Sequence, residues 1–191
     1  MDKKKFTAII LSAGTGSRMK SNMPKQYMEL LGKPVIYYSI KAFEDSPVDE
    51  IVIVCSTDYI EYFRHSIIEK YGFEKVKAIV QGGKERYNSV YEGLKAANGT
   101  DYVLIHDGAR PLVDNEIIVR SMHMVEKEKA CVAGMPVKDT IKVSDELGYQ
   151  QILLTGKACG RFRRRNALNM ICWLSPMISC LVTCHMGKVC R

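Results

Sequence analysis

Short apolar runs alternate with stretches of helical periodicity through most of the chain. The runs are rich in strand-forming residues and predict buried strands at 6–11, 51–55, 76–80, 102–106 and 130–137. Glycine or polar residues follow each run, as they do where a strand gives way to a loop. Strands that are apolar throughout their length are typical of a parallel sheet with both faces covered.

The segments between the runs have the spacing of amphipathic helices. Helices are predicted over 35–43 after Pro34, from a cap at Ser56 or Thr57 to about residue 71, after Gly83, and from a cap at Asn115 to about residue 127. In the third of these, Val90, Leu94 and Ala97 face inward. Strands alternating with helices predict an α/β protein with a Rossmann-like three-layer α/β/α fold and a mostly parallel sheet.

Ligands of such sheets bind at the carboxyl ends of the strands, near a switch in strand order. The chemically informative residues should therefore follow Leu11, Val80, Ile105 and Val137. Glycines, charged residues or both follow each of these four positions.

The loop after the first strand, LSAGTGSRMKSNMPKQY at 11–27, has the composition of a phosphate-binding loop. Gly14 and Gly16 let the backbone approach a ligand and present N–H groups to an anion. Arg18 and Lys25 add a guanidinium fork and a point charge suited to phosphate oxygens. The glycine spacing fits neither the dinucleotide-binding nor the Walker A motif. A glycine turn beside two solvated basic residues is the alternative, and the combination in one loop favours the phosphate site.

This loop, together with LLGKPV at 30–35, resembles the nucleotide-sugar pyrophosphorylase superfamily. Three further stretches resemble the 2-C-methyl-D-erythritol 4-phosphate cytidylyltransferases of the non-mevalonate isoprenoid pathway: GGKERYNSVYEGL at 82–94, HDGARPLV at 106–113 and PVKDTIK at 136–142. The resemblance covers about residues 6–143. Relatives that use ribitol 5-phosphate share the first loop, and the Gly108-Ala109 pair favours the methylerythritol enzymes over them.

The resemblance implies a CTP site and an adjoining sugar-phosphate site. Ser12, Ala13, Gly14, Gly16, Gly82, Gly83, Ser89 and Asp107 are expected to bind CTP; Asp107, Arg110 and Thr140 are expected to bind the second substrate. The glycines after the third strand leave room for a flat base, and Ser89 offers a hydroxyl to its edge. Asp107 is also the candidate ligand for Mg²⁺, the expected cofactor.

Each of these motifs has a structural alternative. The segment after Gly83 also fits a plain helix start with Glu85 and Arg86 on the surface. Asp107 and Arg110 fit an ion pair that stiffens a turn, and 139–142 fits a polar turn. His106 and His65 have no partner at metal-ligand spacing, so no zinc site is predicted in residues 1–150.

The implied reaction is the transfer of CMP from CTP to 2-C-methyl-D-erythritol 4-phosphate, with release of pyrophosphate. The attacking phosphate oxygen is already anionic at neutral pH, so no general base is required. The enzyme must instead align that oxygen with the α-phosphorus and offset the charge on the equatorial oxygens. Arg18 and Lys25 are the candidate catalytic residues.

The charge of the chain is concentrated at one end. The net charge is +7, but residues 151–191 contain no Asp or Glu and carry seven basic residues, so residues 1–150 are neutral. Neutrality of the main part argues against a nucleic-acid partner. The start, MDKKKFTAII, resembles a signal peptide, but the glycine loop follows too soon. We expect a cytoplasmic protein without a membrane partner, and the two cysteines of residues 1–150 fit a reducing compartment.

Residues 151–191 differ so sharply from the rest that we predict an out-of-frame tail. They hold five of the seven cysteines and show no strand alternation, helical stripe or capping pattern. Codons permitted for Ile152 onward, read from the third base, also encode TPDRKGLWQIQTPQCFEYDLL. That string is similar to the family's projecting arm, which implies subunit pairing and a homodimer that is impaired here. Cys180, Cys184 and His185 are therefore not a zinc site, and 161–165 is not a nucleic-acid patch.

Three hypotheses remain open from the sequence. The first is a CTP-dependent cytidylyltransferase with a domain at 1–150. The second is a nucleotide-binding remnant without catalysis, because the altered tail removes part of the substrate site. The third, a tail that binds nucleic acid or metal, is disfavoured by the neutral charge of the main part.

Overall fold

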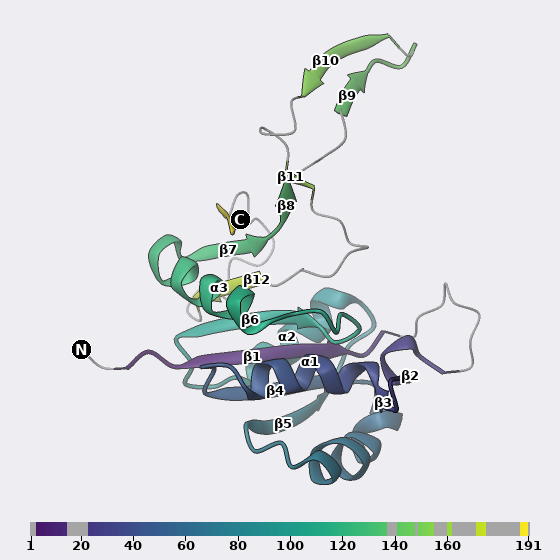
Figure 1. The fold of residues 1–191 in the computed structure, drawn as a ribbon, viewed down its shortest axis with the longest axis vertical. Helices are drawn as coiled ribbons and strands as arrows, with labels where there is room; N and C mark the ends of the chain where they lie inside the picture. The colour runs from purple at the N-terminus through teal and green to yellow at the C-terminus, as the bar shows by residue number, and fades with distance from the viewer. Residues whose placement is uncertain are drawn as a thin grey trace.

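The computed structural model describes residues 3–14, 23–136, 141–147, 149–154, 160–161, 171–174 and 188–190. Its centre is a seven-stranded sheet with the order β13-β7-β12-β6-β1-β4-β5. The strands of this sheet are β1 (Phe6–Ser12), β4 (Glu50–Cys55), β5 (Val76–Gln81), β6 (Tyr102–Asp107), β7 (Ala130–Ala133), β12 (Ile171–Leu174) and β13 (Lys188–Cys190). Figure 1 shows the sheet as the body of the molecule.

The five predicted strands are confirmed, and the sheet they form is mostly parallel. β1 pairs in parallel with β4 and β6, and β4 pairs in parallel with β5. β12 alone runs antiparallel, to both β6 and β7. The predicted fifth strand is shorter than expected, because after β7 the chain continues into β8 (Met135–Pro136), which pairs with β11 (Gly160–Arg161) outside the main sheet.

Helices cover both faces of the sheet, which makes the fold three-layered. α1 (Val35–Glu44), α3 (Asn115–Glu128) and η4 (Tyr62–Glu69) lie on one face, and α2 (Arg86–Ala96) lies on the other. Successive side chains of β1 divide between the layers: Ile10 joins the α1 side, whereas Ile9 packs with Val90 and Leu94 of α2. Each fully buried Ile or Leu side chain contributes about 1.5–3 kcal/mol to folding.

Two helix starts differ from the sequence prediction. Asp114, not Asn115, caps α3, and its side chain accepts a hydrogen bond from the N–H of Ile117 at 2.8 Å. Aspartate in this position satisfies an N–H that has no partner within the helix. Ser56 precedes a 3₁₀ turn, η3 (Thr57–Tyr59), without a capping hydrogen bond from its side chain, and the following segment winds as the π-helix η4.

Four short strands lie at or beyond residue 150, where the sequence shows no strand alternation: β10 (Gln150–Leu154), β11, β12 and β13. β10 forms a hairpin with β9 (Ile141–Ser144), which Figure 1 shows projecting from the body. β12 fills the space between β6 and β7, and β13 extends the sheet beyond β7. The four apolar residues of β12 fit a central position in a sheet, although so short a run carries little periodicity.

The order of the strands fixes the place of the site. The chain passes from β1 outward to β4 and β5, and then returns to β6 on the other side of β1. β1 and β6 are therefore the neighbours at which the strand order reverses, and ligands of open α/β sheets bind beyond the carboxyl ends of such a pair. None of the helices in the described part of the chain has the length and apolar character that crossing a membrane requires.

Candidate functional site

The loops that leave β1 and β6 lie against each other at the switch point. The N–H of Gly108 donates to the carbonyl of Leu11 at 2.8 Å. A side chain at Gly108 would collide with Ile36 of α1 and approach the carbonyl of Leu11. Glycine at this position therefore lets the two loops touch.

The loop after β1 is fixed from its buried side by the segment that contains Lys25. Gln26 and Tyr27 belong to the 3₁₀ turn η2 (Lys25–Tyr27), and both side chains are buried. The Gln26 amide donates to the carbonyls of Ser12 and Gly14, and the Tyr27 hydroxyl donates to the carbonyl of Ser12. Lys25 itself is exposed at the start of this turn.

The loop after β5 reaches the same place. The N–H of Gly82 donates to the carbonyl of Cys55 at 2.8 Å. A side chain at Gly82 would meet Ala13 and Ser89, so glycine at this position lets the loop pass close to both residues. Ser89 is buried, and its hydroxyl forms long hydrogen bonds of 3.4 Å within its own loop and helix. The three stretches predicted to bind CTP are thus brought together in part through glycine packing.

Asp107, the last residue of β6, is held between two arginines. Arg110 donates to one carboxylate oxygen at 2.9 Å, and Arg86, from the first turn of α2, donates to the other at 3.0 Å. Burial acts to raise the pKa of Asp107, but the positive charges and hydrogen bonds of Arg86 and Arg110 outweigh it and lower that pKa below its ordinary value. The carboxylate is therefore ionised, and its side chain is 25% exposed.

Two buried side chains support the turn from beneath. The Ser39 hydroxyl, from α1, lies 3.1 Å from the carbonyls of both Gly108 and Arg110. His106 is fully buried, and its Nε2 lies 3.0 Å from the carbonyl of Arg110, which requires the proton on Nε2. Its Nδ1 has no hydrogen-bond partner among the described residues.

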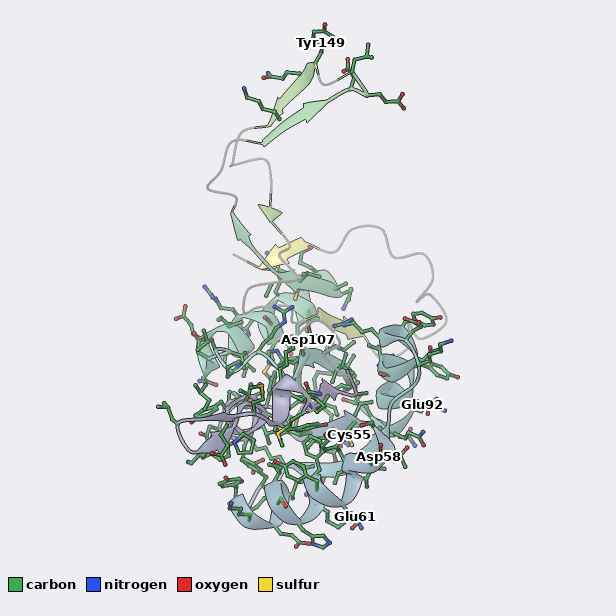
Figure 2. The ribbon with its side chains drawn as sticks, turned by 90° about the vertical axis from the view of Figure 1, so that its right-hand side faces the viewer. Cys55, Asp58, Glu61, Glu92, Asp107 and Tyr149 are labelled. Atoms are coloured by element: carbon green, nitrogen blue, oxygen red, sulfur yellow. The ribbon has the colours of Figure 1, made fainter. Side chains whose placement is uncertain are left out.

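Most of the predicted site residues thus converge on one edge of the sheet. This edge carries Ser12, Ala13, Gly14, Gly82, Gly83, Ser89, Asp107 and Arg110. Arg18, Gly16 and Thr140 lie outside the described residues. Figure 2 shows Asp107 in the body of the molecule, far from Tyr149 on the projecting hairpin.

The sequence interpretation missed several residues that shape this edge. Arg86 was considered only as a surface residue of a helix start, yet it pairs with Asp107. Gln26, Tyr27 and Ser39 carried no functional expectation. The motif order contains one usable signal, since Arg86 follows a glycine pair at the end of a strand, where the first turn of a helix faces the site.

The described residues offer a metal ion only a single carboxylate here. No group of three or more His, Cys, Asp or Glu side chains among them is arranged to hold a metal. Mg²⁺ is commonly bound by one or two carboxylates, with phosphate oxygens and water completing its shell. Asp107 fits a metal that arrives with a triphosphate, provided that Arg86, whose side chain is 49% exposed, yields its place.

The sequence profile of the family "2-C-methyl-D-erythritol 4-phosphate cytidylyltransferase" matches residues 6–159. The chain belongs to this family. It is 52% identical over 145 residues to the 2-C-methyl-D-erythritol 4-phosphate cytidylyltransferase of Lachnoclostridium phytofermentans, covering 76% of this chain and 62% of the relative. It is 54% identical over 144 residues to that of Lachnospira eligens, covering 75% and 63%.

Solved structures of cytidylyltransferase family members share the fold over more of the chain. The 4-diphosphocytidyl-2C-methyl-D-erythritol synthase of Anaerococcus prevotii superposes with a TM-score of 0.78 at 26% identity, covering 96% of this chain and 78% of that one. The Thermus thermophilus cytidylyltransferase superposes with a TM-score of 0.61 at 21% identity, covering 91% and 72%, which supports the fold alone. In sequence, the chain spans less than two thirds of the length of the curated relatives named above.

Proposed function

We propose that the protein transfers CMP from CTP to 2-C-methyl-D-erythritol 4-phosphate and releases pyrophosphate. The observation that carries this proposal is the meeting of the loops after β1, β5 and β6 at the switch point, in a chain of this family. The backbone of Ser12 to Gly14 would bind the triphosphate, and the loop at Gly82 and Gly83 would lie beside the cytidine.

The chemistry requires alignment and charge stabilisation. A phosphate oxygen of the sugar alcohol forms a bond to the α-phosphorus of CTP, while the bond from that phosphorus to the bridging oxygen of pyrophosphate breaks. Arg18 and Lys25 would offset the charge on the equatorial oxygens. Losing one such contact costs on the order of 3 kcal/mol of barrier, or about a hundredfold in rate.

Asp107, Arg110 and Thr140 would bind the sugar-alcohol phosphate. The ionised carboxylate of Asp107 accepts hydrogen bonds from substrate hydroxyls, and Arg110 keeps it oriented. Mg²⁺, when bound with the triphosphate, would neutralise phosphate charge and help to orient the leaving group. Asp107 is the residue available to contact it, which requires Arg86 to turn away.

Nucleotide binding and catalysis are tested separately. Calorimetric titration of the chain as written with CTP and Mg²⁺ should show binding, and Lys25→Ala and Arg18→Ala should weaken it. Release of pyrophosphate is then measured with methylerythritol phosphate and with ribitol 5-phosphate. Unchanged CTP affinity in both variants would contradict the assignment of the loop after β1 to CTP. Faster turnover of ribitol 5-phosphate would favour the relatives that use this substrate.

We also propose that residues 151–191 do not supply the family's usual C-terminal segment. The family match ends at residue 159, near the break in composition. The chain as written should then bind CTP, turn over slowly and dimerise weakly, as a nucleotide-binding remnant would. Restoring the frame should raise turnover much more than CTP affinity. Equal turnover by the written and the restored chains would contradict this proposal, and sequencing the coding DNA tests it directly.

A further inference from the structure

We propose that Gln26 and Tyr27 are positioning residues that hold the loop after β1 in the form that binds the CTP phosphates. This inference rests on the proposed function, because it assigns a role to residues that support the same site. Neither side chain faces the open edge of the sheet, since they are only 3% and 4% exposed. They act through the backbone of Ser12, Ala13 and Gly14.

Gln26 uses both hydrogens of its amide on this loop. Its nitrogen lies 2.9 Å from the carbonyl of Ser12 and 2.8 Å from the carbonyl of Gly14. A primary amide has two N–H donors, so one side chain satisfies two carbonyls two residues apart. This arrangement fixes the path of the backbone through Ala13.

Tyr27 adds a second donor to the same carbonyl. Its hydroxyl lies 3.0 Å from the Ser12 carbonyl and 3.1 Å from the Ser12 hydroxyl. Its ring stacks on Tyr59 with centroids 4.1 Å apart and meets Phe63 edge-on at 5.7 Å. The aromatic packing keeps the hydroxyl in place, so Ser12 is anchored to the body of the protein.

The consequence for a ligand follows from the planarity of the peptide. In a trans peptide the C=O and the next N–H point in opposite directions, and the described chain contains no cis peptide. Because the Ser12 carbonyl is turned toward Gln26 and Tyr27, the N–H of Ala13 is turned away from them. The two carbonyl dipoles that would repel a triphosphate are thereby kept on the buried side, and an N–H is left for an anion.

The same turn also carries Lys25, the candidate catalytic residue. Lys25, Gln26 and Tyr27 are the three residues of η2, so the element that fixes the loop also presents the ammonium group. A change at Gln26 should therefore weaken phosphate binding without removing a group that touches CTP.

The sharpest variant is Gln26→Glu, which keeps the size of the side chain and replaces its donor with a carboxyl group. Gln26→Ala removes the group altogether, and Tyr27→Phe removes one hydroxyl. Gln150→Ala, on the exposed projecting hairpin, and Tyr38→Phe, which loses a hydroxyl bonded to Leu30, are the matched controls. All five are made in the chain as written.

Two measurements decide the inference. CTP affinity, by calorimetry with Mg²⁺, should fall about tenfold or more in both Gln26 variants and a few-fold in Tyr27→Phe, and stay unchanged in the controls. NMR relaxation of the Ala13 and Gly14 amides in the ligand-free protein should report greater mobility in the same variants, while β4 and β6 stay rigid. Wild-type affinity in Gln26→Glu would overturn the inference, because size alone would then suffice.

The relaxation measurement separates this inference from the proposed function. If the unaltered chain binds no CTP, the proposed function fails, yet the mobility of Ala13 and Gly14 still reports whether Gln26 holds the loop. Unchanged mobility there in Gln26→Ala overturns the inference whatever the affinity for CTP.

Discussion

The turn after β6 and the loop after β1 lie at the same edge of the sheet but are held by different physical forces. The turn is fixed by charged groups, since Asp107 lies between Arg86 and Arg110. The loop is fixed by neutral donors, the Gln26 amide and the Tyr27 hydroxyl. The stability of the turn after β6 should therefore depend on charge, pH and salt, whereas the stability of the loop after β1 should not.

Asp107→Asn should have the largest effect on the free energy of unfolding, because it removes the carboxylate at the centre of the turn after β6. The Arg110 side chain is only 12% exposed and donates to the Asp107 carboxylate at 2.9 Å, so the substitution removes the negative charge that this guanidinium faces. The expected loss is about 3 kcal/mol of unfolding free energy, the cost of breaking a largely buried ion pair from one side. Urea unfolding measures it. Asp45→Asn, in an exposed pair with Lys41, is the control and should change stability by less than about 1 kcal/mol.

Acid should weaken the turn through His106 before it affects Asp107. Burial lowers the pKa of His106 from 6.5 to about 4, so the folded protein resists a proton that the unfolded chain accepts. Stability is therefore fully present above pH 6.5 and falls as the pH drops toward 4, by on the order of 3 kcal/mol. The share of Asp107, whose pKa is lowered, is lost only below its ordinary value of 3.8.

His106→Gln tests that assignment, because glutamine can place a donor near the position of Nε2 and does not titrate. Urea unfolding between pH 7 and 4 should then lose most of its pH dependence. If stability depends on pH as steeply in the variant as in the parent protein, groups other than His106 set the acid sensitivity. The turn would then depend less on His106 than the geometry implies.

Ser39→Ala should have an intermediate effect, because it removes a neutral support of the charged turn. The hydroxyl contacts the carbonyls of Gly108 and Arg110, and its loss should cost about 1–2 kcal/mol of unfolding free energy. The frame-restored chain should also show a higher KM for the sugar phosphate. Ser46→Ala, which loses a buried hydrogen bond to Phe43 elsewhere, should lower stability and leave that KM unchanged.

Arg86→Ala should have the smallest effect on stability and the clearest dependence on salt. The Arg86 side chain is half exposed, so its pair with Asp107 should contribute less than about 1 kcal/mol. Unfolding at low and at high ionic strength should differ less in the variant than in the parent protein. Tyr27→Phe, in the neutral loop, should show the same salt dependence as the parent. An equal change of salt dependence in Arg86→Ala and Tyr27→Phe would contradict the difference between the charged turn and the neutral loop.

The sequence predicted the strands around this site, and the residues that directly follow them, better than the side chains that hold its loops in place. The five strands were evident because their apolar runs are continuous, and Gly14, Asp107 and Arg110 were evident because they follow those runs. Arg86 was not evident. It lies on α2 and its partner Asp107 ends β6, 21 residues further along the chain, and such a pair leaves no periodic pattern in the sequence. The same holds for Gln26, whose two acceptors lie in a segment that precedes it by more than a helical turn.

The strands beyond residue 150 leave no such signal. The sequence there shows no strand alternation, yet β12 pairs with β6 on one side and β7 on the other. A strand of four apolar residues needs only a complementary gap in the sheet, and a gap is a property of the assembled fold that no local pattern reports.

The position of β12 imposes an order on folding while the chain is being synthesised at the ribosome. β5, β4, β1 and β6 can assemble once Asp107 has emerged, but β7 reaches the sheet only through β12, which ends at Leu174. At the usual elongation rates the intervening residues take roughly 3–13 s to appear. During that interval the nascent chain presents the free edge of β6, an apolar strand with unpaired backbone groups that can recruit another chain. A chaperone that covers this edge until β12 arrives should raise the yield of folded protein more than one that acts after release.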